Sequence, residues 1–505
     1  MDREMLERAK RVSLLASTEV RMTIPSILAE GEGFSLRISV KGADALPFED
    51  FQNRMVFENC RGLEGLPESF ALSKGEWSAE IEGLKATGPD VVSIRARVEG
   101  TGNVSGDPVV SASPAWVFKD PPYRAYWGDI HIHTLFSNCG PWRAKDPEWA
   151  YVYGRDVSHL DFAGIADHLR GIALDPGRWP RTQELARLYN EPGRFVPLLG
   201  FESSHAQGYG GDNNAYFLND DAPYFWVEGR KDMRGIRPEV HLKKLWEFLD
   251  GQRSPYFTVP HHTGRAGKYR TFEEPYHDPK REPLFEIFSS WGSSENRWNA
   301  FPMSGGNNDE PAYFVDALKA GCRYGVIASS DDHATLPGGL NNHRGTPLGL
   351  ASLAGNSHKG LAAVRAPELT REALFKSMRE RQTYATTLVR TLLDLRVGDA
   401  GMGEEIAVPA GDPMRARRTI SLRATPDRTS GATATLVRNG VEIAQKPLGR
   451  SESGIHKIEF EDAESLEDVA IRDARFHPEP FVVYYVRLMG RKANCQWTSP
   501  VWLDL

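Results

Sequence analysis

The stretch Gly128-Asp129-Ile130-His131-Ile132-His133-Thr134 decides the fold, because it places two histidines two residues apart in an apolar run. Side chains at positions i and i+2 of a β-strand point to the same face, so His131 and His133 are positioned to bind one ion. A single His-x-His pair is weak evidence, since a strand that carries two half-buried histidines is the commoner case. Residues outside this stretch therefore have to decide between the two interpretations.

Five other apolar, strand-like runs carry an acid or a histidine at or near the carboxyl end. They span about 162–166, 195–201, 256–260, 283–288 and 324–330, and the groups concerned are Asp167, His168, Glu202, His261, His262, Glu286, Asp331, Asp332 and His333. Six of the 14 histidines in the chain thus fall at strand ends. Imidazole and carboxylate groups are common ligands of divalent cations, so the pattern predicts a metal site.

Size and composition describe a folded protein of several domains. The chain has 505 residues, which exceeds one ordinary hydrophobic core and predicts two or three domains. Lys and Arg total 61 against 68 Asp and Glu, a net charge of −7 that gives no long-range attraction for nucleic acid. We therefore expect a small-molecule substrate and no nucleic-acid partner, while a local basic cluster can still bind a small anion.

The ends of the chain and its cysteines bear on the compartment. The amino-terminal residues are charged, and no apolar run approaches the ~20 residues that cross a bilayer. The four cysteines are widely scattered and include no Cys-x-x-Cys pair, which favours reduced thiols over a disulfide framework. We expect a cytoplasmic protein without a membrane partner, whose oligomeric state the sequence does not specify.

Three segments differ in hydrophobic pattern. Residues 1–118 alternate short apolar runs with turn residues, which predicts an antiparallel β-sandwich. Residues 119–391 alternate apolar strands with helical stretches, and a single long run of such β/α units predicts a barrel with its chemistry at the carboxyl ends of the strands. Residues 392–505 return to period-two alternation, which predicts a second, immunoglobulin-like β-sandwich.

Several motifs of the central segment, in this order and spacing, resemble those of the PHP superfamily, which is named for its polymerase-associated and histidinol-phosphatase members. The motifs are Trp127-Gly128-Asp129-Ile130-His131-Ile132-His133-Thr134, Ile165-Ala166-Asp167-His168, Gly200-Phe201-Glu202, Val259-Pro260-His261, Ser330-Asp331-Asp332-His333 and Arg381-Gln382-Thr383-Tyr384-Ala385-Thr386-Thr387. The likeness covers roughly residues 126–387. More narrowly, the chain is similar to a branch of large uncharacterised PHP-like proteins with β-rich flanks.

The resemblance implies an α/β fold, a distorted TIM-like (β/α)7 PHP barrel flanked by N- and C-terminal β-sandwich domains. It also implies two or three divalent cations, usually Mn, Zn or Fe, and the hydrolysis of phosphate esters. Carried over position by position, the first cation is held by His131, His133 and Asp331, the second by His261, and the third by His168 and His333. Glu202 matches the carboxylate that bridges two cations and is the expected catalytic centre.

Two departures from the family pattern affect the expected ligands. Where the family places an aspartate for the third cation, this chain has Asn138 followed by Cys139, which either ligates a soft metal or is an inert thiol beside a loop. Where related chains carry a histidine, this chain has Asp212, and His205 is a competitor for the same role. We expect Asp212 to complete the second site.

Phosphoryl transfer needs positive charge around the metals, because positioning and charge stabilisation supply most of the catalysis. The candidate cations are Arg170, Arg265, Lys268 and Arg344, each of which is otherwise a solvated loop residue. His262 is either a general acid toward the leaving group or a structural histidine that points away from the ligands. Asp167 and Asp332 are expected to hydrogen-bond ligand imidazoles. Trp291, together with Trp142, Trp149, Tyr209 and Trp298, is a candidate wall for an organic group.

These expectations favour a metal-dependent hydrolase of a small organic phosphate mono- or diester. A second interpretation keeps the metal-activated water but changes the bond, to a phosphonate, sulfate ester, lactone or amide. A third is a glycan- or partner-binding protein in which the metals merely brace the fold. The number of candidate ligands argues against bracing, since a structural site is usually closed and four-coordinate.

Overall fold

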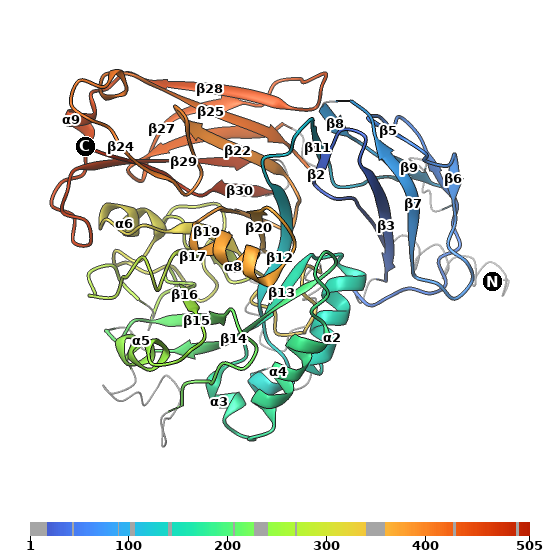
Figure 1. Ribbon diagram of the computed structural model, residues 1–505, viewed down its shortest axis with the longest axis horizontal. Coiled ribbons are helices and arrows are strands. Elements are labelled where there is room, and N and C mark those ends of the chain that lie inside the picture. The colour runs from blue at the N-terminus through green and yellow to red at the C-terminus, as the bar shows by residue number, and fades with distance from the viewer. Residues whose placement is uncertain are drawn as a thin grey trace, which may run out of the picture.

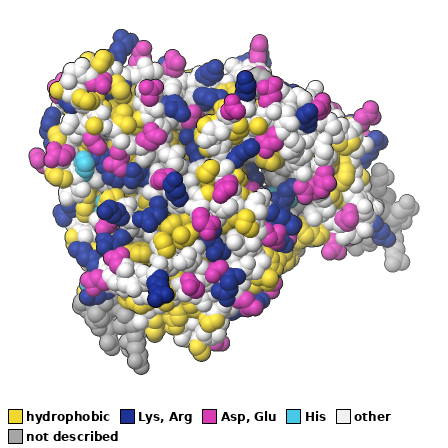
Figure 2. Space-filling view, in the orientation of Figure 1, with side chains coloured by type: hydrophobic (Ala, Val, Ile, Leu, Met, Phe, Trp, Pro, Cys, Tyr) yellow, Lys and Arg dark blue, Asp and Glu magenta, His cyan; other side chains and the backbone are white. Residues whose placement is uncertain are grey.

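The structure is a computed structural model (Figure 1), and it describes residues 18–42, 45–88, 90–100, 107–139, 144–205, 208–226, 241–267, 270–339, 359–427, 431–490 and 494–505. The described chain is rich in β-strands and has few helices. Among its helices, none combines the length and the apolar character that crossing a bilayer requires. On the face drawn in Figure 2, basic and acidic side chains are interspersed.

The described residues between positions 18 and 118 form three small sheets (blue in Figure 1). The first has the order β1(Glu19–Thr23), β3(Gly33–Lys41), β7(Ser78–Ala86) and β5(Leu63–Glu64), and all its pairs are antiparallel. The second sheet has the order β10(Val109–Ser111), β9(Arg95–Val98), β4(Met55–Phe57) and β6(Ser69–Phe70). The third has the order β2(Ile27–Ala29), β11(Ala115–Phe118) and β8(Asp90–Val92). Their apolar faces enclose one core that includes Leu36, Ile38 and Val92.

The central part is built on three parallel strands, β12(Arg124–Ile132), β13(Phe162–Ile165) and β14(Val196–Ser204). On one side β15(Asp212–Phe217) and β16(Tyr256–Pro260) extend this sheet in antiparallel fashion, and on the other side β20(Leu361–Ala366) and β21(Thr383–Thr386) do so. A separate sheet contains β17(Leu284–Ser289), β18(Gly292–Ser293) and β19(Gly325–Ala328). Because β17 contacts β16 and β19 contacts β20 and β21, the strands curve around a shared interior.

Short helices connect and cover these strands. They are η1(Leu135–Ser137), α2(Pro147–Val152), η2(Tyr153–Val157), α3(Leu169–Ile172), α4(Arg178–Leu188), α5(Leu242–Asp250), α6(Phe314–Lys319) and α8(Arg371–Arg379). All four residues of β13 are buried, as expected for a parallel strand that is covered on both faces. The regular alternation of seven β/α units is not observed in the described residues, because β14 pairs directly with the antiparallel β15.

Beyond residue 391 the chain returns to strands, as the sequence pattern indicates. A four-stranded sheet has the order β23(Ala400–Gly401), β22(Leu392–Val397), β25(Arg418–Thr425) and β28(His456–Asp462). The remaining elements are β24(Glu405–Ala407), η4(Pro413–Arg415), β26(Thr433–Arg438), β27(Val441–Pro447), α9(Leu466–Val469), β29(Phe481–Met489), β30(Cys495–Thr498) and β31(Val501–Asp504). Since β30 pairs with β21, the large central sheet continues across the expected boundary at residue 391. The division of the chain at residues 118 and 391 stays a prediction.

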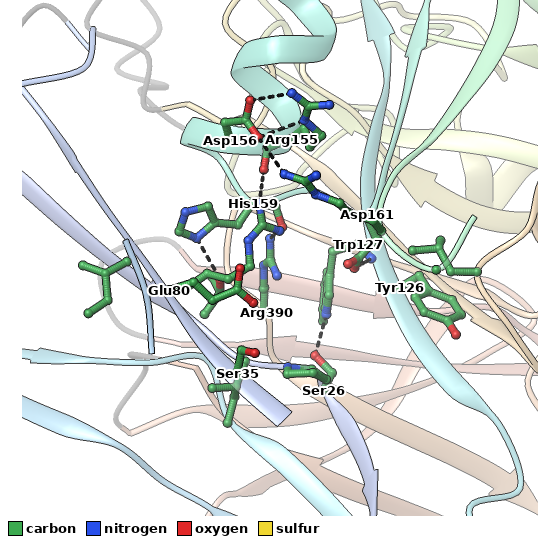
Figure 3. A pocket seen from close by; sticks show the side chains of 18 of the residues that line it. Ser26, Ser35, Glu80, Tyr126, Trp127, Arg155, Asp156, His159, Asp161 and Arg390 are labelled. Carbon is green, nitrogen blue, oxygen red and sulfur yellow. Dashed lines mark hydrogen bonds and ion pairs between the residues drawn. The ribbon is translucent and has the colours of Figure 1, made fainter. Parts of the chain in front are cut away.

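A cavity of about 810 Å³ lies between the N-terminal sheets and the central part (Figure 3). At its wall the indole of Trp127 donates a hydrogen bond to the Ser26 hydroxyl at 2.8 Å. His159 adopts φ 54°, and its Nδ1 lies 2.7 Å from the Thr23 hydroxyl oxygen. The guanidinium of Arg390 donates to the His159 carbonyl at 2.6 Å, so the loop is held through its backbone.

The buried His159 makes this contact sensitive to acid. Burial, followed by the nearby Arg37, Arg21 and Arg390, holds the pKa of His159 well below its ordinary value. Below about pH 6.5 the unfolded chain therefore binds a proton that the folded chain excludes, and folding weakens by up to about 1.4 kcal/mol per pH unit while the folded ring stays neutral.

We predict that His159→Asn, which tolerates the left-handed backbone, reduces the loss of unfolding free energy between about pH 7.5 and about pH 5.5. Urea denaturation of both proteins at the two pH values, in metal-free buffer, measures this difference. An equal loss in the variant and the wild type would contradict the assignment of the acid sensitivity to His159.

Candidate metal centre

The carboxyl ends of the central strands meet at one rim. His131 and His133 lie at the end of β12, His168 follows β13, and Glu202 lies near the end of β14. Isolated parallel bridges join His168 to Glu202 and Ile132 to Asp332, so these strand ends are direct neighbours. The structure thus brings together side chains that lie up to about 200 residues apart in the sequence, because the end of β19 in the separate sheet lies beside the end of β12.

Asp212 reaches the same rim by a different route. It is the first residue of β15, which runs antiparallel to β14, and it pairs in register with Ser204. The amino end of β15 therefore lies beside the carboxyl end of β14. Asp212, His261 and His262 form one group whose potential ligand atoms all lie within 4.8 Å of one another.

Glu202 lies at the centre of the cluster and is only 2% exposed. Its Oε2 is 2.8 Å from His168 Nδ1 and 3.4 Å from His133 Nε2, whereas its Oε1 is 3.4 Å from His261 Nε2. The two oxygens of one carboxylate thus face two different sets of imidazoles. Both oxygens therefore lie where they can contribute to cation binding.

Asp331 provides the second central carboxylate. Its Oδ1 lies 3.1 Å from His133 Nε2 and 3.6 Å from His131 Nε2, and these three residues form another compact group. Asp331 has φ 50°, a left-handed conformation that is uncommon outside glycine and that concentrates at functional sites. The backbone turns here so that the carboxylate faces the histidines.

The expectation that His262 points away from the ligands is wrong. Its φ of 31° ends the extended conformation of β16, so the side chain does not alternate to the opposite face. Its Nε2 lies 3.2 Å from Asp212 Oδ2, and its Nδ1 lies 3.3 Å from Asp331 Oδ2. His262 therefore connects the two carboxylates from inside the cluster.

Polar partners orient the histidines of β12. His131 Nδ1 lies 3.0 Å from Glu286 Oε2 on β17, and His133 Nδ1 lies 2.9 Å from the Ser137 hydroxyl. In each ring the outer nitrogen is engaged, which leaves Nε2 directed into the cluster. The sequence showed Glu286 near a strand end but gave no reason to pair it with His131, because the partner strands are far apart in the chain.

Asp167 and Asp332 brace loops at the rim. Asp167 accepts hydrogen bonds from the backbone N–H and the hydroxyl of Thr134, both at 2.6 Å. Asp332 lies 2.8 Å from the ammonium of Lys359. The expected role of Asp167 as a partner of a ligand imidazole is therefore replaced by one in fixing the loop that follows β12.

Cys139, and not Asn138, joins the cluster. Asn138 is exposed, whereas Cys139 forms a group with His133, His168 and His333 whose potential ligand atoms lie within 4.8 Å of one another. Burial raises the pKa of the Cys139 thiol, but the charges of His133 and His333 and hydrogen bonds with His168 and His333 outweigh it and lower the pKa to about 4. The structure favours the ligand interpretation of this cysteine over the inert thiol.

The charges of the cluster keep its central carboxylates ionised. Burial alone raises the pKa of Glu202, but the charge of His168, whose Nδ1 lies 2.8 Å from Glu202 Oε2, holds it well below its ordinary value. Burial also raises the pKa of Asp331, but the nearby His131, His133 and His262 outweigh this effect and hold the pKa well below its usual range. Burial lowers the pKa of His131, and the opposing charges of Asp331 and Glu286 raise it well above the ordinary value.

The residues fit the binding of metal ions. Several buried ligand atoms make no hydrogen bond to any described residue, namely His131 Nε2, His261 Nε2, Asp212 Oδ1 and Asp331 Oδ2. Buried polar atoms are normally satisfied, so a cation is the natural partner for a convergent set of nitrogen and oxygen donors. His205 belongs to none of these groups; its Nε2 lies 3.0 Å from the Ser203 hydroxyl, which favours Asp212 as the further ligand.

The expected substrate-binding residues are placed unevenly. The guanidinium of Arg265 lies 4.2 Å from the ring centre of Trp291, whose ring is 6.0 Å from that of His333 and 6.4 Å from that of His262. Arg170 is exposed on α3, two residues after His168. Lys268, Arg344 and Trp142 lie outside the described residues. Trp149 packs on Tyr153 and Trp298 is 84% exposed, so of these tryptophans Trp291 alone is seen to border the histidines.

We predict that Glu286→Gln weakens cation binding about 10- to 100-fold, because it removes the carboxylate that orients His131 and makes it more basic. Competition with a fluorescent chelator measures the affinity, and Glu247→Gln, an exposed residue of α5, is the control. Wild-type affinity in Glu286→Gln would contradict its positioning role.

Comparisons with known proteins give distant similarities. No protein-family model matches the chain. It is 26% identical over 411 residues to an uncharacterized protein of Chlamydia pneumoniae, covering 80% of this chain and 61% of that protein. It is 27% identical over 423 residues to an uncharacterized protein of Chlamydia muridarum, covering 83% and 62%. The chain thus spans less than two thirds of the length of either relative.

Among solved structures, the chain is similar to a two-domain protein from Bacteroides vulgatus that contains a predicted PHP-like metal-dependent phosphoesterase. The match has 13% sequence identity and a TM-score of 0.34, and it covers 75% of this chain and 95% of that chain. At this TM-score the likeness carries no argument, so the interpretation of the site depends on its own geometry.

Proposed function

We propose that the chain is a metal-dependent hydrolase that acts on a small organic phosphate mono- or diester. The observation that supports this most directly is the Glu202 carboxylate, whose two oxygens face separate sets of imidazoles. One cation position would be held by His131, His133 and Asp331, and a second by Glu202 and His261 together with His131. Cations bound at these residues would lower the pKa of a bound water and neutralise the oxygens of a phosphoryl group.

The protein's own contribution is to hold these groups rigidly and to exclude water. Glu202, Asp331, His131 and His261 are at most 3% exposed, so their charges act in a medium of low polarity. His262 contacts both Asp212 and Asp331, and we assign it to the ligand cluster instead of to proton donation. Because phosphoryl transfer depends chiefly on position and charge, such a cluster needs no nucleophilic side chain.

Arg265 and Trp291 form the substrate side of the site. The guanidinium stacked on the indole is held by a cation–π contact, and the same indole borders His262 and His333. A phosphate at the cluster therefore lies near a fixed positive charge and beside an apolar face. This combination suits an anionic ester with an organic leaving group.

A purely structural role for the cations fits the geometry less well. A bracing site is closed, with four ligands around one ion. Here four overlapping groups of ligands share His131, His133 and His261. Overlapping groups are the mark of a multinuclear site, in which neighbouring ions act on one substrate.

We predict that protein purified without chelator and supplied with Mn²⁺ hydrolyses a chromogenic phosphomonoester or phosphodiester. The matched panel contains a sulfate ester, a carboxyl ester and a phosphonate. Turnover of the sulfate or carboxyl ester alone would replace the phosphoesterase with a hydrolase of another bond. No turnover of any substrate, with the metals loaded, would overturn the proposed function.

We predict that Glu202→Gln lowers kcat at least about 100-fold, because Glu202 is itself a proposed ligand shared by two cation positions. A residue that only orients a metal ligand contributes up to about 100-fold, so the loss should reach at least that size. Activity is measured at saturating Mn²⁺ and compared with Glu184→Gln, an exposed residue of α4. Unchanged kcat in a folded Glu202→Gln protein would reject the shared carboxylate.

We predict that Arg265→Ala raises KM for the anionic ester about 10-fold and changes kcat less, since a lost charge–phosphate contact costs on the order of 1.4 kcal/mol or more. Arg265→Lys restores part of the binding because it keeps the charge but loses the planar stack. Arg417→Ala, on the distant C-terminal sheets, is the control. A KM equal to that of the wild type would remove Arg265 from substrate binding.

A further inference from the structure

The backbone of the loop after β12 reverses direction, so that a cysteine enters the cluster. Thr134 caps η1, its hydroxyl accepting a hydrogen bond from the Phe136 N–H at 3.1 Å, and Asn138 ends η1 with φ 58°. This left-handed residue reverses the chain, which leaves Asn138 exposed and places Cys139 against three imidazoles. Asp167 accepts two hydrogen bonds from Thr134 and so holds the loop in place beside the cluster.

In two of the three imidazoles, Nδ1 is engaged by an oxygen, and Nε2 is the nitrogen left for a cation beside Cys139. His333 Nδ1 lies 3.1 Å from the Asp331 carbonyl oxygen, and a carbonyl only accepts, so Nδ1 carries the proton. His168 Nδ1 lies 2.8 Å from Glu202 Oε2. An ionised carboxylate can only accept a hydrogen bond, so this Nδ1 carries a proton as well. In both rings Nε2 is therefore the nitrogen that can bind a metal ion, which takes the place of any proton on that atom.

We infer that Cys139, His168 and His333 form a thiolate-containing cation position that selects Zn²⁺ over Mn²⁺ and Mg²⁺, beside the carboxylate-rich positions around Glu202. Thiolate and imidazole are ligands that zinc prefers, whereas manganese and magnesium favour oxygen. His133 belongs to the same group but lies 3.1 Å from Asp331 Oδ1, so it is shared with the neighbouring position.

With Cys139, His168 and His333 as its dedicated ligands, a bound zinc ion would resemble those of catalytic sites, which have three protein ligands and a position for water or substrate. The ring of Trp291 is 6.0 Å from that of His333, so the group lies on the substrate side of the cluster. The contribution of this position to turnover rests on the proposed function. The ligation of a cation by Cys139 does not.

The test uses the full-length protein, stripped of metal and then loaded with Co²⁺, which takes zinc positions and absorbs in the near ultraviolet when a thiolate is bound. We expect this charge-transfer absorption in the wild type, its loss in Cys139→Ser, and its retention in Cys60→Ser. Cys60 lies in the N-terminal sheets and is matched in being partly exposed. Zinc analysis should show one bound ion fewer per chain in Cys139→Ser.

Cys139→Asp provides a second variant, with an oxygen ligand in place of sulfur. We expect it to bind a cation without the charge-transfer absorption, and its preference for Zn²⁺ over Mn²⁺ to fall at least about tenfold. Undiminished absorption in Cys139→Ser, or no absorption in fully loaded wild type, would overturn the inference. Absorption without ester hydrolysis would instead reject the proposed function, so the two failures are distinguishable.

Discussion

The structure depends on the compensation of buried negative charge at one rim. Glu202, Asp331, Asp212 and Glu286 are each at most 3% exposed, and moving a carboxylate out of water costs several kcal/mol unless positive charge balances it. Imidazoles of described residues lie against all four carboxylates. Imidazoles can balance this charge as protonated rings, or they can remain neutral and share divalent cations with the carboxylates, and the convergence of Nε2 atoms favours the second arrangement.

This requirement explains how the surrounding elements are built. Parallel strands bring His131, His168 and Glu202 to one edge, and the antiparallel β15 adds Asp212 from its amino end. Left-handed residues turn the chain where a straight strand would direct a side chain away, as at His262 and Asp331. Such conformations cost about 1–3 kcal/mol each, and the packed sheets and loop-bracing residues such as Asp167 hold them in place.

Much of the site follows from local sequence rules, and the remainder does not. Period-two spacing predicts that His131 and His133 share a face, and strand ends predict the neighbourhood of His168, His261 and Asp331. Glu286, by contrast, reaches His131 across 155 residues, which no local pattern reveals. The entry of Cys139 depends on a backbone reversal at Asn138, and the inward position of His262 depends on its φ. The fold itself departs from regular β/α alternation because β14, β15 and β16 pair as an antiparallel meander.

The central claim is that side chains from several strands hold two or more cations around Glu202. Anomalous X-ray diffraction from crystals of protein purified without chelator, recorded at the absorption edges of Mn, Fe and Zn, tests it most directly. We expect at least two peaks, each about 2.0–2.3 Å from its ligand atoms, with one oxygen of Glu202 facing each of two ions. Fully ordered Glu202, His261 and Asp331 side chains with no anomalous peak among them would contradict the account.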